Sequence, residues 1–192
     1  MTPFRLVPGV LILLALILPD RVLAAGTGTW EFGMDAGFNM AYVDDEDDSI
    51  LSVGLPTAEF GSLLQGLRLA RFLSPEVEIE TTVGFNYAGE GGYSLWRLGI
   101  GMDGIYNLVT GEGPESTRPV PFLRAGGTIN VYGQEQYSES QLGLGAGAGV
   151  RFPLGGRFAL RVEAGGARHF ETNELPGHWD VTGSVGLSVF SR

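Results

Sequence analysis

Charged side chains stand at every second position of several apolar segments, and this spacing offers the clearest candidates for chemistry. It places them on one face of an extended strand, where acids and arginines from different strands can meet. Buried charges of one sign are costly, whereas paired charges are tolerated, so we predict a network of ion pairs. A polar conduit for small solutes and a catalytic carboxylate pair are the alternatives. The set comprises Glu31, Asp35, Arg68, Glu78, Glu80, Arg97, Asp103, Arg124, Arg151, Arg161 and Glu163.

A run of acids is the second candidate, because carboxylate oxygens are the ligands that calcium and magnesium prefer. Its spacing does not match an EF-hand loop: counted from Asp44, position six is Ser49 instead of glycine, and position twelve is Leu55 instead of glutamate. We expect a solvated loop tip, with binding of a divalent ion or a partner as the alternative. The run consists of Asp44, Asp45, Glu46, Asp47 and Asp48.

Histidine and cysteine, the common ligands of transition metals, are scarce. The chain has no cysteine, which excludes a disulfide, a thiol nucleophile and a thiolate metal site. Its two histidines, His169 and His178, leave little for a histidine-based metal site. We predict neither a metal nor another cofactor, and we interpret both histidines as residues without a catalytic role.

The composition argues against nucleic acid as a partner. Twelve arginines and no lysine stand against 22 acidic residues, so the formal charge is −10 and the pI is near 4.6. A surface that binds nucleic acid has to be basic. Glycine is the other outlier, with 31 of 192 residues. These glycines follow no collagen period and stand among large apolar residues, so they indicate neither collagen nor a disordered linker.

The N-terminal residues 1–24 have the layout of a secretory signal peptide. A basic start precedes an apolar run over residues 6–18, and small residues follow up to Ala25. The run is shorter than the roughly 20 residues of a membrane-spanning helix, which makes a membrane anchor the weaker interpretation. We predict cleavage after Ala24 or Ala25 and a single domain over residues 25–192.

The remaining chain alternates with a period of two instead of the helical period of 3.6. In residues 141–152, apolar side chains alternate with Gly143, Gly145, Gly147 and Gly149. Residues 29–43 alternate over a length that suits a tilted strand crossing a bilayer better than a soluble strand of about five or six residues. We predict eight strands, at about 29–43, 61–73, 77–87, 95–108, 121–132, 141–152, 158–170 and 179–190.

The two faces of these strands decide between a membrane barrel and a soluble one. If the apolar faces pointed inward, the solvent-exposed face of the sheet would carry rows of glycine, which weaken a strand. With the apolar face against lipid, the glycines leave room for charged side chains in a narrow interior. We predict an all-β fold, an eight-stranded antiparallel up-and-down transmembrane β-barrel, with a soluble lipocalin-like carrier as the rival. Predicted lipid-facing residues include Phe32, Val83, Ile100, Leu144 and Val162.

The predicted connections indicate an orientation. With the N-terminus in the periplasm, the connections at 44–60, 88–94, 133–140 and 171–178 lie at the cell surface, and they hold acids but no arginine. The turns at 74–76, 109–119 and 153–157 then lie in the periplasm. An acidic rim would repel the phosphates of lipopolysaccharide. We therefore expect the Asp44–Asp48 run either to bridge to lipopolysaccharide through magnesium or calcium, or to bind a basic surface.

Two stretches resemble the outer-membrane protein β-barrel domain family, which holds the OmpA transmembrane domain and the OmpX-type small barrels. Residues 66–80 (GLRLARFLSPEVEIE) are similar to its second strand, tight turn and third strand, and residues 121–127 (PFLRAGG) to its fifth strand. The resemblance is one of pattern, extends over the whole mature chain, and brings no shared catalytic residues. It implies periplasmic chaperones and the barrel-assembly machinery as partners. The C-terminal Phe190, followed by Ser191 and Arg192, departs from the family because it is out of phase with the preceding lipid-facing residues.

These features together predict a monomer in the outer membrane of a Gram-negative bacterium, in contact with lipid and lipopolysaccharide. We expect a non-enzymatic protein with a structural or surface-interaction role in the cell envelope. A narrow channel for small solutes is the first alternative, and a lipid A-modifying enzyme is the second. For the enzyme, residues 168–173 (RHFETN) lie near the expected outer rim, but they lack the His-x-Ser-Asn signature that we associate with the deacylases.

Overall fold

Strands dominate the computed structural model, which describes residues 27–43, 49–54, 66–90, 93–108, 118–134 and 137–191. The predicted signal peptide and the Asp44–Asp48 run lie outside these residues. No described segment is a helix long and apolar enough to cross a membrane. The described residues form nine strands: β1 (Trp30–Val43), β2 (Ser49–Gly54), β3 (Leu67–Phe72), β4 (Val77–Glu90), β5 (Tyr93–Asn107), β6 (Val120–Gln134), β7 (Tyr137–Gly155), β8 (Phe158–His169) and β9 (His178–Phe190).

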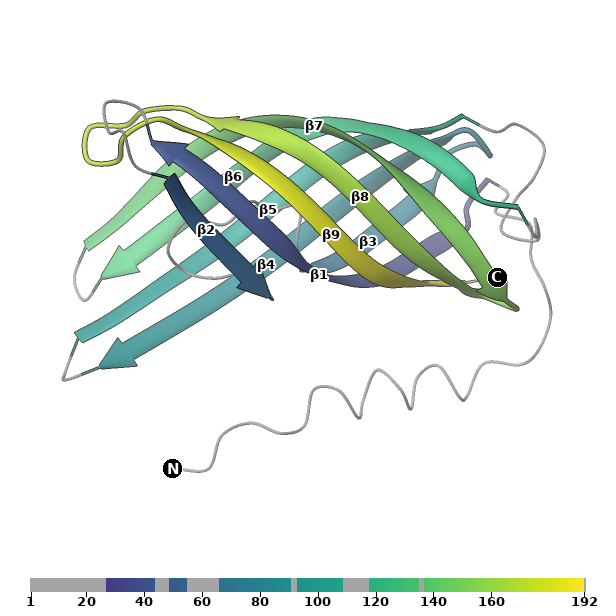
Figure 1. The fold of residues 1–192 in the computed structure, drawn as a ribbon, viewed down its shortest axis with the longest axis horizontal. Helices are drawn as coiled ribbons and strands as arrows, with labels where there is room; N and C mark the ends of the chain where they lie inside the picture. The colour runs from purple at the N-terminus through teal and green to yellow at the C-terminus, as the bar shows by residue number, and fades with distance from the viewer. Residues whose placement is uncertain are drawn as a thin grey trace.

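The strands close into an antiparallel up-and-down barrel (Figure 1). From β3 to β9 each strand pairs with the next along the chain, and β1 pairs with β9 over its length from Glu31 to Val43. The other edge of β1 pairs with β3 near Trp30 and with β2 near Tyr42, so β2 and β3 share one place in the wall. The predicted eight-stranded antiparallel barrel is therefore confirmed.

Strand boundaries differ from the prediction mainly at one end of the barrel. β2 lies inside the predicted 44–60 loop, and only residues 91–92 and 135–136 separate the strands of two hairpins expected to have longer loops. Pairing continues to Glu90↔Tyr93 and to Gln134↔Tyr137. Polar side chains near a hairpin tip interrupt the apolar alternation, but they do not interrupt backbone pairing. A prediction from apolar alternation alone therefore ends these strands too early.

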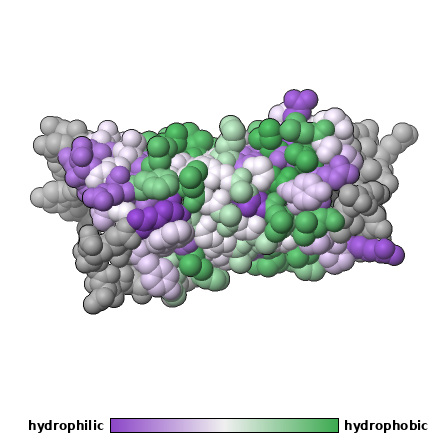
Figure 2. Space-filling view, turned by 90° about the horizontal axis from the view of Figure 1, so that it is seen from above, coloured by the Kyte–Doolittle hydropathy of each residue, from purple (hydrophilic) through white to green (hydrophobic). Residues whose placement is uncertain are grey.

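The outer wall carries the large apolar side chains. Phe32, Val83, Ile100, Leu144 and Val162, the predicted lipid-facing residues, all point outward and are between 39% and 60% exposed. Figure 2 shows hydrophobic side chains spread over this wall. Because inward and outward positions alternate along each strand, the neighbouring positions face the interior.

The two ends of the barrel differ, and we call them the terminal end, where β1 begins and β9 ends, and the loop end, where β8 ends and β9 begins. At the terminal end Phe72, Ala159 and Phe190 pack together inside the barrel. The ring centroids of Phe72 and Phe190 are 6.1 Å apart. The out-of-phase Phe190 therefore faces inward, where it fills the interior.

One tight turn at the terminal end depends on glycine. Gly155 and Gly156 join β7 to β8 and have φ angles of 102° and 59°. Residues that carry a side chain rarely adopt these backbone angles, whereas glycine does so readily. This turn fixes the register in which the inner face of β8 meets that of β7.

Candidate functional site

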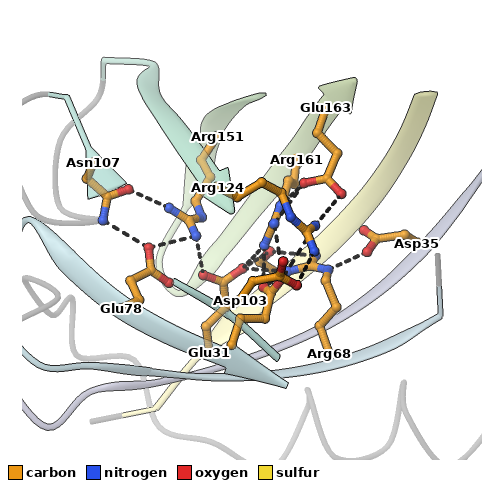
Figure 3. Close-up of polar contacts among 12 residues, drawn as sticks. Glu31, Asp35, Arg68, Glu78, Asp103, Asn107, Arg124, Arg151, Arg161 and Glu163 are labelled. Atoms are coloured by element: carbon orange, nitrogen blue, oxygen red, sulfur yellow. Dashed lines mark hydrogen bonds and ion pairs between the residues drawn. The ribbon is translucent and has the colours of Figure 1, made fainter. Parts of the chain in front are cut away.

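All of the charged residues predicted for one face lie inside the barrel, each no more than 6% exposed. The structure brings ten of them into direct contact (Figure 3). Arg97 instead lies over the ring of Tyr132. We call these ten the ion-pair network. They are Glu31, Asp35, Arg68, Glu78, Glu80, Asp103, Arg124, Arg151, Arg161 and Glu163.

Arg161 lies at the centre of the ion-pair network. Its Nη1 is 2.5 Å from Glu80 Oε2, and its Nη2 is 2.7 Å from Glu163 Oε2. Nη1 also lies 3.7 Å from Glu31 Oε1. These acids come from β4, β8 and β1, so the guanidinium of Arg161 links opposite walls of the barrel.

Arg68 joins the β1 side of the ion-pair network. Its Nη1 is 2.9 Å from Glu31 Oε1 and 3.3 Å from Glu80 Oε2, and its Nε contacts Asp35. The hydroxyl of Ser188 donates a hydrogen bond of 2.6 Å to Glu31 Oε1. Arg68 Nη2 also donates a hydrogen bond of 3.2 Å to Ser188 Oγ, so one buried guanidinium contacts the three strands that meet where the barrel closes.

Arg124 and Arg151 complete the ion-pair network. Arg124 Nη1 lies 2.9 Å from Glu163 Oε1, and its Nη2 contacts Asp103. Arg151 Nη2 lies 2.8 Å from Glu78 Oε1 and 3.1 Å from the second oxygen of Glu31. Each of the four arginines therefore contacts at least two carboxylates, which occupies the groups that would attract an anionic solute.

Aromatic side chains pack against the ion-pair network on the side nearer the terminal end. The guanidiniums of Arg151 and Arg161 each lie 4.6 Å from the ring centroid of Phe122. Arg151 also lies 5.9 Å from the ring of Phe72. An arginine over an aromatic face gains cation–π attraction, which is stronger in a desolvated site than at the surface.

Glycines on the inner wall make room for these charged groups. A Cβ added to Gly33 would overlap the guanidinium of Arg68, and one added to Gly186 would overlap the carboxylate of Asp35. Gly126 stands in the same relation to Asp103. The glycine content noted in the sequence thus has a steric cause at these positions.

A second polar group lies at the loop end, and the sequence analysis did not foresee it. His169, His178 and Asp180, which we call the histidine cluster, are all buried. The two imidazole rings are stacked, with centroids 4.4 Å apart and an interplanar angle of 11°. His169 Nε2 lies 3.1 Å from Asp180 Oδ2, and His178 Nε2 lies 3.8 Å from Asp180 Oδ1.

Amide side chains surround the histidine cluster. The amide nitrogen of Asn130 lies 3.4 Å from His169 Nδ1, and that of Asn39 donates a 3.3 Å hydrogen bond to Asp180 Oδ1. Arg97 interacts electrostatically with Asp180, and its guanidinium lies 5.0 Å from the ring centroid of Tyr132. Within the described part of the chain, this cluster alone groups three His, Cys, Asp or Glu ligands closely enough to hold a metal ion.

The sequence contained a signal for the histidine cluster. His169 ends β8 and His178 begins β9, so the two histidines face each other across the hairpin. Asp180 follows His178 by two residues and therefore shares its face. The inward phase of Arg161 and Glu163 also extends along β8 to His169. The sequence analysis placed residues 168–173 near a rim of the barrel but did not recognise that His169 points inward.

No known family model and no curated protein sequence matches the chain. Solved structures do. Neisserial surface protein A has a TM-score of 0.54 at 16% identity over 85% of this chain and 97% of that chain. The outer membrane protein OprG from Pseudomonas aeruginosa has a TM-score of 0.54 at 11% identity over 90% and 100%.

The N-terminal β-barrel domain of Pseudomonas aeruginosa OprF is similar as well, with a TM-score of 0.51 at 14% identity over 86% of this chain and 99% of that chain. These structures are small outer-membrane barrels. The likeness shows that the chain has their fold, which confirms the resemblance inferred from the sequence at that level.

Proposed function

We propose that this chain is a non-enzymatic outer-membrane barrel with a structural or surface-interaction role in the cell envelope, and that its interior does not conduct solutes. The observation that carries the proposal is the ion-pair network. Its four arginines and six acids cross the lumen and engage one another at distances of about 2.5–3.7 Å. A narrow barrel filled in this way has no continuous path for water.

The outer wall supports a membrane location. Leu142, Leu144, Met102 and Phe85 are each at least 60% exposed, although they are large and apolar. An apolar wall of this extent is unusual for a soluble protein, whereas it is what a barrel needs against lipid. The paired edges of β1 and β9 leave no open sheet edge at the point of closure, as a bilayer requires.

The surroundings of His169 give no support to a lipid A-modifying enzyme. Hydrolysis with a Ser–His–acid arrangement needs a hydroxyl nucleophile next to the ring nitrogen that the acid does not hold. In His169, Asp180 lies beside Nε2 and the amide of Asn130 lies beside Nδ1. Both ring nitrogens thus face partners other than a nucleophile.

Conductance tests the closed interior. We expect the refolded mature chain, inserted into planar bilayers, to give no steady single-channel openings. Insertion is verified by heat-modifiable mobility and by protease protection. Reproducible openings whose ion selectivity changes in Arg161→Gln, but not in the outward-facing Arg71→Gln, would establish the channel alternative instead.

A lipid-face substitution tests the membrane location. Arginine on the lipid face of an outer-membrane barrel costs about 2–4 kcal/mol near the bilayer midplane. We expect Leu144→Arg to destabilise the barrel in lipid vesicles by an amount in this range, and Leu144→Ala to do so much less. Equal stability of both variants in vesicles would contradict a lipid-facing wall.

The environment of the barrel follows from the same proposal. We propose lipopolysaccharide as its neighbour, with the Asp44–Asp48 run as a contact through a divalent cation or as a site for a basic partner. Replacing the five acids with serine and asparagine tests this contact. Retention in lipopolysaccharide-containing membranes should fall and lose its sensitivity to chelator; unchanged retention would leave the run as a solvated tip.

A further inference from the structure

We propose that His169, His178 and Asp180 form a binding site for one divalent transition-metal ion of the zinc class inside the loop end of the barrel. The site goes beyond the proposed function, because neither a closed interior nor a membrane location requires it. The ion it would take is identified by its ligands: imidazole nitrogens suit zinc, copper, nickel and iron, whereas calcium and magnesium prefer oxygen alone.

The fold places both histidines of the chain next to each other. Its two histidines are a directly opposed pair, His169↔His178, at the ends of β8 and β9. Asp180 faces the same way from two residues further along β9, and all three side chains are at most 1% exposed. Buried polar groups need partners, and here the two imidazoles share a single carboxylate.

The distances suit a metal ion once the stacked rings turn apart, because an imidazole binds a metal in its own ring plane and these two rings are only 11° from parallel. One ligand atom from each of the three residues lies within 4.8 Å of the other two. A tetrahedral zinc ion with bonds of about 2.0–2.1 Å holds its ligands roughly 3.4 Å apart. The 3.1 Å between His169 Nε2 and Asp180 Oδ2 is already close to that spacing. Three protein ligands leave a fourth position for water, as in many zinc sites.

The surrounding amides orient the ligands. Asn39 holds Oδ1 of Asp180, which turns Oδ2 toward His169. A metal on His169 Nε2 requires the ring proton on Nδ1, next to the Asn130 amide. The Oδ1 atom of Asn130 has no hydrogen-bond partner among the described residues, so a rotated amide can accept that proton. Outer partners of this kind fix the tautomer of metal-bound histidine.

The inner wall leaves space for the His169 ring. A Cβ added to Gly143 would lie 2.8 Å from His169 Nδ1 and 2.7 Å from Thr128 Oγ1, both closer than real Cβ contacts. The 170–177 connection borders the site, and its Pro176 carbonyl accepts a hydrogen bond of 3.0 Å from Gln141. The site therefore lies next to the loop end of the barrel.

Zinc titration of the refolded, untagged barrel tests the proposal, because a histidine tag would add competing imidazoles. After chelator treatment, isothermal titration should show one Zn²⁺ per chain, and excess Mg²⁺ should not displace it. We expect His178→Gln and Asp180→Asn to lower the affinity by more than the roughly 10–100-fold typical of losing an outer partner. The control variant Glu171→Gln/Glu174→Gln, which alters exposed acids in the neighbouring connection, should bind as the parent chain does.

A measurement on the unaltered chain keeps the test independent of variant folding. The two imidazoles give the only histidine ring signals in the ¹⁵N spectrum of the protein, since there are no other histidines. Both should shift on addition of Zn²⁺ and stay unchanged with Mg²⁺. Absence of zinc binding would overturn the proposal. So would zinc that leaves both imidazole signals unchanged, or that binds the histidine variants as tightly as the parent.

Discussion

The two polar regions inside the barrel are built from different kinds of charge. In the ion-pair network, each guanidinium contacts at least two carboxylates, and these contacts link walls on opposite sides of the lumen. The histidine cluster has one carboxylate, two imidazoles and neighbouring amides. Permanent charges that satisfy one another make a structural plug, whereas two imidazoles beside a single acid are the ligand types that a transition-metal ion prefers. The comparison predicts that stability resides in the first region and ion binding in the second.

Breaking the ion-pair network at its centre should have the largest effect. Arg161→Met leaves Glu80 and Glu163 buried without their main cation, and loss of one partner of a buried pair costs about 3–5 kcal/mol. We expect a decrease of that size in the free energy of unfolding, followed in urea by the fluorescence of the three tryptophans.

Neutralising Glu80 in the same variant should recover part of the lost unfolding free energy. Glu80 keeps longer contacts with Arg68 and Arg124, but the double variant Arg161→Met/Glu80→Gln removes one of the excess buried acids, so the barrel should be more stable than with Arg161→Met alone. An equal loss from Glu80→Gln in the parent chain and in the Arg161→Met variant would show that the charges of Arg161 and Glu80 do not depend on each other.

A glycine substitution sharpens the comparison sterically. Gly33→Ala forces a methyl group against the guanidinium of Arg68, which the surrounding carboxylates hold in place. Overpacking of this kind costs about 1–3 kcal/mol. The control is Gly104→Ala on the outer face, where the nearest atom to the added Cβ is 3.9 Å away. Equal unfolding free energies for the two variants would contradict the close packing of the network.

The histidine cluster should contribute less to stability. Asp180→Asn keeps the shape of the side chain and removes one carboxylate charge. We expect a loss of about 0.5–1.5 kcal/mol, the net value of a typical hydrogen bond. The same urea titration measures it, while zinc binding is lost. A decrease as large as that in Arg161→Met would remove the distinction between the two regions.

The smallest effect is expected at Arg97. This residue carries a permanent charge, as the ion-pair network does, but it interacts with Asp180 of the histidine cluster. Arg97→Gln removes a positive charge that interacts with Asp180 and would oppose a bound cation. Zinc affinity should rise a few fold. The unfolding free energy should change little, because removing a buried charge offsets the lost contact with Tyr132. Weaker zinc binding in this variant would indicate that Arg97 positions Asp180 instead of repelling the ion.

The ion-pair network was predictable from the sequence because strand parity is strict. Glu78 and Glu80, or Arg161 and Glu163, stand two residues apart, so one inward residue assigns the next. Which arginine meets which acid was not predictable, because partners such as Glu31 and Arg151 lie on strands that meet only across the lumen. The histidine cluster needed one further quantity, the register of β8 against β9, which the 170–177 connection sets. β2 was missed because its short segment lies between acidic residues and a stretch without clear alternation.

The closure of β1 against β9 has a consequence for the time course of folding. Glu31 meets Ser188 across 157 residues of chain, and Arg68 meets Ser188 across 120. Contacts between residues so far apart in sequence form slowly, because the chain has to lose much of its conformational entropy before these contacts can stabilise it. The buried acids and arginines therefore have to stay hydrated until the last strand arrives, and they enter the low-dielectric interior together. An assembly pathway that inserts strands one by one would expose these charges to lipid, so we expect the ends of the chain to meet before the barrel is fully inserted.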